Sequence, residues 1–248
     1  MQTQSQSIDI NVDVGEGIGN ESLFMPYVSS CNIACGGHAG NAKTMRKVVK
    51  LAKQHRVKIG AHPSFPDIEN FGRKPMDMPC VALYTSIKEQ INDLIAILDE
   101  EKALLHHVKP HGALYNMAIT DTKIAATIIE VMKSMALPVK LYVPYKSVIE
   151  TLALQNNIPV IYEVFADRNY NDDLTLVSRT EKNALIDNYE TMFEHVFHMI
   201  EKRKVKTITG AEVVIKAETF CVHGDTLHAE ELLKKLHVNL EVKGVKIL

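Results

Sequence analysis

The sequence predicts an α/β fold in which about seven strand–helix units form a closed or nearly closed parallel β-barrel. Three observations predict it. Short apolar runs alternate with amphipathic helical stretches along the chain, and polar residues recur where most of the apolar runs end. The length of 248 residues suits one such barrel, so we expect a single domain over residues 1–248. A barrel is favoured over an open sheet because many strands supply one rim of a barrel, whereas an open sheet gathers ligands at one switch point.

Seven short segments have the length and the apolar character of strands. Several of them are rich in Val and Ile, as strands that are buried on both faces require. The predicted strands are Ile8–Val14, Val28–Ala34, Val57–Ala61, Leu104–Lys109, Val139–Val143, Pro159–Phe165 and Thr219–His223.

Between these strands, apolar residues recur at helical spacing. The predicted helices are Asn41–His55, Pro79–Lys102, Asp121–Met135, Tyr145–Asn156, Asn183–Lys202 and Thr226–Val242. Asn41 and Asp121 are expected to be N-caps, because their short polar side chains accept hydrogen bonds from the first helical turn. Thr207–Ile215, with Gly210 near its middle, predicts a small β-hairpin before the last main strand.

The composition is that of an ordinary globular protein with a sizeable core. Hydrophobic residues make up 46% of the chain and charged residues 23%. Because 28 Lys and Arg nearly balance 30 Asp and Glu, we expect neither a nucleic-acid partner nor an anionic-membrane partner. The first seven residues are polar, and no apolar run approaches the roughly 18 residues that span a bilayer, so we expect a cytoplasmic protein. The four cysteines form no C-x-x-C pair and are expected to be reduced and mostly buried.

The first strand carries an unusual polar stripe. Residues 8–16 read IDINVDVGE. Since strand side chains alternate between faces, the Ile and Val residues would face the helices, while Asp9, Asn11 and Asp13 would face the barrel interior. An unpaired buried carboxylate costs several kcal/mol, so this stripe must meet cations, hydrogen-bond donors or a metal. The alternative is an exposed edge strand whose polar face is in contact with solvent.

Polar side chains also follow five further strands, often beside glycines that let the backbone approach a ligand closely. A lone His after a strand is usually a surface or core residue, but a barrel would bring all these strand ends together. Because Pro110 lies between His107 and His111, only His111 is expected to reach the rim. The candidates are His38, His62, Lys109, His111, Tyr115, Asp167, Arg168, His223 and Asp225.

These residue types suit hydrolysis. Attack of water on an unreactive carbonyl group needs a base that takes a proton from the water, and Glu16, Asp13 or a His could be this base. It also needs positive charge where an oxyanion develops, which Lys109, Arg168 or a metal could supply.

The residue patterns also bear on metal and nucleotide binding. Asp13, His38 and His62 have the mixture of carboxylate and imidazole that a divalent metal takes, although no H-x-x-x-H or H-E-x-x-H pattern supports a site. The chain also lacks a G-x-x-x-x-G-K-[ST] loop, a G-x-G-x-x-G after a strand and a G-x-S-x-G elbow. If ATP is used, we expect another chain to bind it.

The same segments carry a resemblance to a known family. The chain resembles the LamB/YcsF family, whose members are described as the A subunit of the prokaryotic 5-oxoprolinase, from about Ile8 to its C-terminus. The segments that carry the likeness are residues 9–16, 32–36, 38–40, 59–63, 71–73, 108–116, 163–168 with Tyr170, and 221–225.

The resemblance implies a distorted seven-stranded TIM-like (β/α) barrel similar to glycoside hydrolases and polysaccharide deacetylases. It implies ATP-dependent hydrolysis of the lactam C–N bond of 5-oxo-L-proline to give L-glutamate. Partner subunits B and C are expected, which resemble the halves of a carboxylase-associated or allophanate-hydrolase-like protein. ATP is then expected to bind with or at these partners.

Roles follow for the candidate residues. We expect Asp13 or Glu16 to position and deprotonate water, and Lys109 and His111 to stabilise or protonate the departing groups. The expected substrate-binding residues are Asn11, His38, His62, Arg73, Tyr115, Asp167, Arg168, His223 and Asp225, with Arg168 or Arg73 pairing with the substrate carboxylate. Two alternatives stay open, namely a stand-alone metal-dependent deacetylase or amidohydrolase, and a non-catalytic subunit that delivers substrate.

Overall fold

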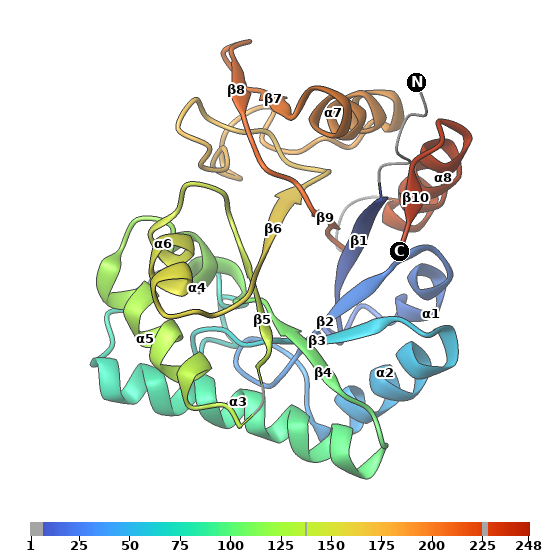
Figure 1. Cartoon of the computed structure of the whole chain (residues 1–248). Helices are drawn as coiled ribbons and strands as arrows, with labels where there is room; N and C mark the ends of the chain where they lie inside the picture. The colour runs from blue at the N-terminus through green and yellow to red at the C-terminus, as the bar shows by residue number, and fades with distance from the viewer. Residues whose placement is uncertain (1–6, 137, 225–227) are drawn as a thin grey trace.

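The computed structural model describes residues 7–136, 138–224 and 228–248 and shows a closed barrel of parallel strands (Figure 1). Its strands pair in the order β1-β2-β3-β4-β5-β6-β9, and β9 pairs back with β1 to close the barrel. The strands are β1 (Ser7–Val14), β2 (Ser30–Ala34), β3 (Lys58–His62), β4 (Leu105–Val108), β5 (Lys140–Val143), β6 (Val160–Phe165) and β9 (Thr219–Val222). The predicted seven-stranded α/β barrel is therefore confirmed.

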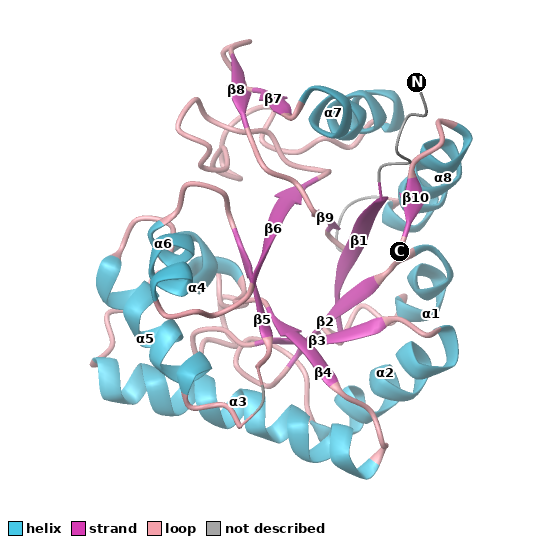
Figure 2. Ribbon diagram, in the orientation of Figure 1, coloured by secondary structure: helices cyan, strands magenta, loops and turns pink. Residues whose placement is uncertain are grey.

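Helices surround the barrel on its outside (Figure 2). α2 packs against β2 and β3, α3 packs between α2 and α5, and α7 packs beside α8. Apolar faces of these helices supply the core, as the helical spacing predicts. The long helices are α2 (Ala42–His55), α3 (Cys80–Glu100), α5 (Thr122–Lys133), α6 (Val148–Gln155), α7 (Tyr189–Lys202) and α8 (Ala229–Val242).

Several short elements complete the described chain. β7 and β8 form an antiparallel hairpin near the predicted one, with Gly210 in its turn at φ +89°. β10 pairs with the start of β1 outside the barrel. The sequence did not predict the short helices or β10. These elements are α1 (Glu21–Phe24), the 3₁₀ helix η1 (Met25–Tyr27), α4 (Gly112–Met117), β7 (Lys204–Lys206), β8 (Glu212–Val214) and β10 (Lys246–Ile247).

The first strand lies inside the sheet, so the alternative of an exposed edge strand is wrong. β1 pairs with β2 on one side and with β9 on the other. Ile10 and Val12 are fully buried towards the helices, while Asn11 and Asp13 are buried among polar side chains of the barrel interior. The register places Asp13 opposite Asn32 of β2, which starts the polar network described below.

Both predicted N-caps are confirmed, and two helices begin later than predicted. The Asn41 side chain accepts from the Thr44 amide, and Asp121 accepts from the Lys123 and Ile124 amides. α6 begins at Val148 because Ser147 caps it.

α7 begins at Tyr189 rather than near Asn183. Residues 184–187 form a loop instead of the first helical turn. The Ala184 carbonyl accepts from the Asn169 amide, and the Ile186 amide donates to the Asp167 carbonyl, so these backbone groups are not used within a helix. Asn188 then caps the helix. The predicted start of the last helix at Thr226 lies outside the described residues.

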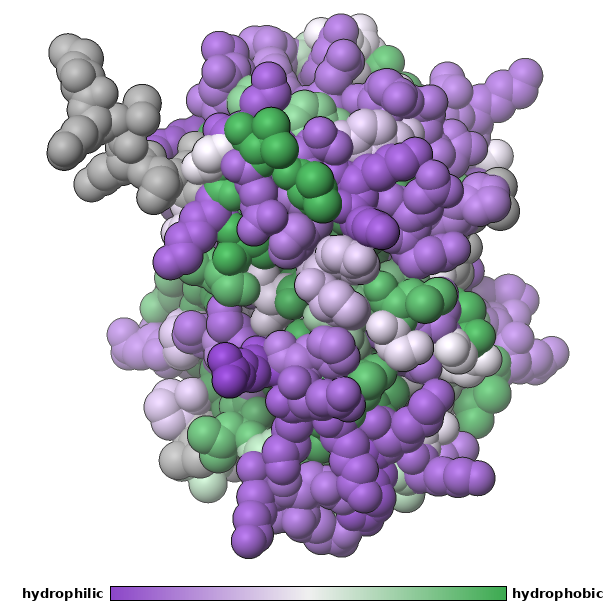
Figure 3. All heavy atoms as spheres, turned by 90° about the vertical axis from the view of Figure 1, so that its right-hand side faces the viewer, coloured by the Kyte–Doolittle hydropathy of each residue, from purple (hydrophilic) through white to green (hydrophobic). Residues whose placement is uncertain are grey.

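The surface is mixed in character. Among the described helices, none has the combination of length and apolar content that crossing a bilayer requires. Hydrophilic side chains predominate on the face that carries α8, α1 and α2, and hydrophobic ones form separate patches there (Figure 3). All four cysteines are free, and Cys80 alone among them is exposed, as expected for mostly buried thiols.

Candidate active site

A cavity of about 470 Å³ opens where the barrel strands end. Loop residues 175–180 form part of its wall, together with the start of α4. The barrel therefore brings together candidates from strands that are far apart in sequence. Of the predicted site residues, the cavity is lined by Asp13, His62, Arg73, Lys109, His111, Tyr115, Arg168 and His223.

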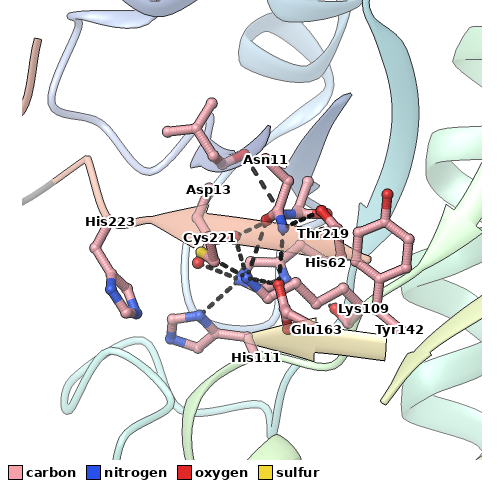
Figure 4. Close-up of polar contacts among 12 residues, drawn as sticks. Asn11, Asp13, His62, Lys109, His111, Tyr142, Glu163, Thr219, Cys221 and His223 are labelled. Carbon is pink, nitrogen blue, oxygen red and sulfur yellow. Dashed lines mark hydrogen bonds and ion pairs between the residues drawn. The ribbon is translucent and has the colours of Figure 1, made fainter. Parts of the chain in front are cut away.

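Lys109 is the centre of the cavity floor (Figure 4). Its Nζ lies 2.9 Å from Asp13 Oδ1 and 2.9 Å from Glu163 Oε1. It also lies 3.0 Å from Cys221 Sγ. All four side chains are buried, so one ammonium group balances carboxylates from β1 and β6.

These contacts decide the charges on the floor. Burial alone would raise the pKa of Asp13, but His62 and Lys109 hold this pKa well below its usual value. Burial alone would lower the pKa of Lys109, but Asp13, Cys221 and Glu163 raise it well above its usual value. Asp13 is therefore a carboxylate and Lys109 an ammonium at neutral pH.

Asn11 lies below the cavity rather than in its lining. Its Nδ2 donates to Thr219 Oγ1 at 2.8 Å and to Glu163 Oε1 at 3.0 Å. Asn32 Nδ2 donates to Asn11 Oδ1 at 2.7 Å and to Asp13 Oδ1 at 2.8 Å. The two amides thus hold the carboxylates of the floor in place, and Figure 4 shows Asn11 beside Thr219 and Glu163.

His62 and His111 face each other across one side of the cavity. His62 Nδ1 donates to the Lys109 carbonyl at 2.7 Å, and His111 Nε2 donates to the Phe71 carbonyl at 3.0 Å, since a carbonyl oxygen can only accept. The other two ring nitrogens, His62 Nε2 and His111 Nδ1, lie 2.9 Å apart. His62 Nε2 is also 3.4 Å from Asp13 Oδ2. As predicted, His111 reaches the cavity, whereas His107 is buried against Asn32.

Glu16 and His38 lie directly behind this histidine pair. His38 Nε2 lies 3.0 Å from Glu16 Oε1, and the His38 ring stacks on His111 with centroids 3.6 Å apart. Glu16 Oε1 is 3.6 Å from His111 Nδ1. Neither Glu16 nor His38 is among the residues that line the cavity.

Two groups of side chains in the described part of the chain could hold a metal ion. Glu16, His38, His62 and His111 each offer one ligand atom, and these atoms lie within 4.8 Å of one another. The expected metal ligands His38 and His62 belong to this group. The third expected ligand, Asp13, belongs with Cys221 and His223 to the second group.

His223 is oriented by a buried carboxylate. Its Nδ1 lies 2.9 Å from Asp167 Oδ1, and its backbone amide donates to Asp167 Oδ2 at 2.9 Å. Its ring stacks on Phe165. With Nδ1–H donating to Asp167, Nε2 is left to accept or to exchange a proton. Asp167 is fully buried, and Asp225 lies outside the described residues.

Three arginines line the cavity. Arg73 and Arg179 are exposed, and Arg73 lies over the Phe71 ring at 4.9 Å. Arg168 is buried, and its Nη2 donates to the Val177 carbonyl at 2.6 Å, which ties it to the loop wall. Burial, followed by the positive charge of Arg179, lowers the pKa of Arg168. The lining thus concentrates positive charge for an anionic ligand.

Sequence reasoning missed Glu163, Asn32 and Arg179 as site residues. Glu163 could have been predicted from the sequence, because an acidic residue within an apolar strand is expected to point into the barrel, as Asp13 does. Arg179 could not have been predicted, since only the path of the loop brings it to the cavity.

The sequence is similar to those of several known proteins. Residues 8–248 match the LamB/YcsF family. The chain is 42% identical over 242 residues to a protein named as the A subunit of 5-oxoprolinase from Histophilus somni (strain 129Pt), covering 98% of each. It is 41% identical over 247 residues to the protein of that name from Bacillus cereus (strain AH187), covering 97% of this chain and 98% of the other.

A solved structure agrees with these sequence relatives. The lactam utilization protein from Thermus thermophilus matches with a TM-score of 0.91 and 35% identity, covering 98% of this chain and 99% of that one. Family, relatives and fold agree over nearly the whole chain, which therefore belongs to the LamB/YcsF family.

Proposed function

We propose that this chain is the A subunit of a cytoplasmic ATP-dependent 5-oxoprolinase, which opens the lactam ring of 5-oxo-L-proline to L-glutamate together with partner subunits B and C. The relatives named as the A subunit of 5-oxoprolinase support this assignment. The observation that carries it is one cavity that joins guanidinium groups to a buried acid–lysine–histidine set. That combination suits a small substrate with one carboxylate and one amide.

The arginines account for recognition of the substrate carboxylate. A guanidinium pairs with a carboxylate through two parallel hydrogen bonds. Arg73 and Arg179 are exposed and line the cavity, and Arg168 is buried and donates to the loop. We assign carboxylate binding to Arg73 and Arg179, and we assign to Arg168 the positioning of the loop between them.

The floor accounts for stabilisation of the reacting amide. Water must add to the carbonyl carbon, the C–N bond must break, and the nitrogen must take up a proton. The ammonium of Lys109 supplies positive charge beside the reacting carbon and its phosphorylated oxygen, because its raised pKa keeps it protonated. Asp13, which lines the cavity and is held by Lys109 and Asn32, positions and deprotonates the water, and Glu16 behind the histidine pair is the alternative.

Proton transfer to the departing nitrogen is assigned to His223. Asp167 holds Nδ1, so Nε2 is the exchanging atom, as in other carboxylate–histidine pairs. His111 is less suited to donate a proton, because burial and its neighbours His62 and His38 lower its pKa well below the usual value.

Coupling to ATP is assigned to the partners. An amide is resonance-stabilised, and transfer of a phosphoryl group from ATP to its oxygen, with release of ADP, would make it a good electrophile. A first water then adds to the carbon and the C–N bond breaks to give an acyl phosphate, and a second water cleaves this acyl phosphate to glutamate and phosphate. The chain itself carries no phosphate-binding loop of the P-loop type.

The test is release of glutamate from 5-oxo-L-proline with ATP, using the chain alone, the partners alone and the full set. We expect product from the full set only, and Asp167→Asn in this chain should lower kcat by about 100-fold through the wrong His223 tautomer. Lys182→Gln, an exposed change outside the cavity lining, is the matched control. Full activity of the isolated chain would contradict the division of labour, and normal turnover with Asp167→Asn and Lys109→Met would favour a delivery subunit instead.

A further inference from the structure

The His62–His111 contact has two acceptors facing each other. His62 Nδ1 and His111 Nε2 both donate to backbone carbonyls, so each ring already carries its hydrogen on the far nitrogen. In neutral rings, His62 Nε2 and His111 Nδ1 are then lone-pair atoms, yet they lie only 2.9 Å apart. Two buried lone pairs at this distance repel unless a cation lies between or beside them.

The surrounding distances suit a metal ion better than a shared proton. A proton would satisfy the two nitrogens only. Bonds of about 2.0–2.2 Å to one ion place neighbouring ligand atoms about 3.0–3.5 Å apart, depending on whether the geometry is octahedral or tetrahedral. The observed separations are 2.9 Å for the two nitrogens, 3.4 Å from His62 Nε2 to Asp13 Oδ2, and 3.6 Å from His111 Nδ1 to Glu16 Oε1.

The far nitrogens of both rings are held as metal-binding histidines usually are. A ligating His almost always donates its other N–H to a carboxylate or a backbone carbonyl, which sets the tautomer and aims the lone pair. His62 donates to the Lys109 carbonyl and His111 to the Phe71 carbonyl. The two rings are nearly perpendicular, at 84°, so both lone pairs can point at one position.

His38 does not fit as a ligand beside His111. A ring lone pair lies in the plane of its ring, and the His38 and His111 rings are parallel within 3° at 3.6 Å between centroids. Two such rings cannot aim lone pairs at the same ion. His38 instead contacts Glu16 Oε1 at 3.0 Å, which makes it a positioning residue for that carboxylate.

We propose that Glu16, His62 and His111, with Asp13 beside them, bind one divalent transition-metal ion. Two imidazoles with carboxylate oxygen select ions such as Zn²⁺, Mn²⁺, Fe²⁺ or Co²⁺ over Mg²⁺ or Ca²⁺. Two carboxylates balance the charge of the ion. The site lies at the side of the cavity and does not depend on the lactam chemistry proposed above, because the ion would bind whatever the substrate is.

The first experiment uses the full chain, freed of metal by a chelator and then titrated with Zn²⁺, Mn²⁺ or Co²⁺. We expect one ion per chain by elemental analysis and calorimetry. His62→Gln and His111→Gln should each weaken binding by about 100-fold or more, and His38→Gln by about 10-fold through the orientation of Glu16. His55→Gln, which changes an exposed His at the end of α2, is the matched control and should bind as the original chain does.

The second experiment needs no variant and settles the alternative of a shared proton. The ¹⁵N shifts of the imidazoles in the original chain should show His62 metallated at Nε2 and His111 at Nδ1 when Zn²⁺ is added. The proposal is overturned if the ¹⁵N shifts show an imidazolium in this pair and do not change when metal is added. It is also overturned if the His62→Gln variant binds the metal with the same affinity as the His55→Gln variant. Loss of metal binding and loss of glutamate release are measured separately, so either proposal can fail without the other.

Discussion

Lys109 Nζ donates to Asp13 Oδ1 at 2.9 Å although the two residues are 96 positions apart in the chain. Asp13 belongs to the first strand and Lys109 follows the fourth, so the pair exists only because the barrel closes around it. Glu163 Oε1 lies at the same distance from Nζ, which makes the lysine the cation shared by two buried carboxylates.

Replacing this cation should destabilise the fold strongly. Lys109→Met leaves Asp13 and Glu163 buried without their counter-ion, and we expect the free energy of unfolding to fall by about 3–5 kcal/mol. Urea denaturation at pH 7 measures it. Lys133→Met removes an exposed pair with Glu130 and should change stability by less than about 0.5 kcal/mol. Equal effects of the two changes would show that the floor is not held by charge.

Gly60 is required by the packing of His107 inside the barrel. A methyl group on Gly60 would overlap the His107 imidazole, which is fixed by its stack on Tyr142 and its contact with Asn32. Gly60→Ala should therefore cost at least about 1–3 kcal/mol of stability by urea denaturation.

A control and a rescue separate overlap from other effects. Gly210→Ala places a methyl group in open space, so its cost comes only from its positive φ. Adding His107→Ala should remove most of the Gly60→Ala penalty. If Gly60→Ala still cost as much in the His107→Ala background, overlap with the imidazole would not be the cause.

Acid should weaken the fold through His107. Its burial, followed by the electrostatic influence of His106 and Lys109, lowers the pKa of His107 well below 6.5, so the folded ring stays neutral while the unfolded ring takes up a proton. The unfolded state then binds more protons below about pH 6.5, and stability falls as the pH falls through that window. The lowered pKa of Asp13 acts in the same direction below about pH 4.

The pH effect is measured as a slope. Unfolding free energies between pH 6.5 and 4.5 should fall by up to about 1.4 kcal/mol per pH unit for this one group. His107→Gln should flatten the slope by that amount, whatever it does to absolute stability. A slope unchanged in His107→Gln would assign the acid sensitivity to other groups.

Arg179 should contribute to substrate affinity more than to turnover. In the full 5-oxoprolinase assay, Arg179→Gln is expected to raise KM for 5-oxo-L-proline by about 10-fold or more with a smaller change in kcat, because it removes a charge that pairs with the carboxylate before and during reaction. The exposed Lys182 lies outside the cavity lining but in the same loop, so Lys182→Gln is the comparison. Matching KM values for the two variants would argue against carboxylate binding at this loop.

Most of the strands and helices were predictable because their signals are local. Val and Ile runs and helical spacing depend on neighbouring residues only, and the alternation in β1 placed Asp13 inside the barrel correctly. The start of α7 was not predictable from spacing, since the Asp167 carbonyl accepts from the Ile186 amide and the Asn169 amide donates to the Ala184 carbonyl, which holds residues 184–187 in a loop.

The candidate site likewise has features that the sequence predicts and features that depend on the tertiary structure. Residue types and their places after strands are properties of the chain, and they were enough to name Asp13, Lys109, His111 and His223 as candidates. Which atoms meet was decided by barrel closure, because parallel register and the pairing of β9 with β1 set distances that no local pattern contains. The 2.9 Å approach of His62 Nε2 to His111 Nδ1 is such a distance, because it depends on the register in which β3 and β4 pair.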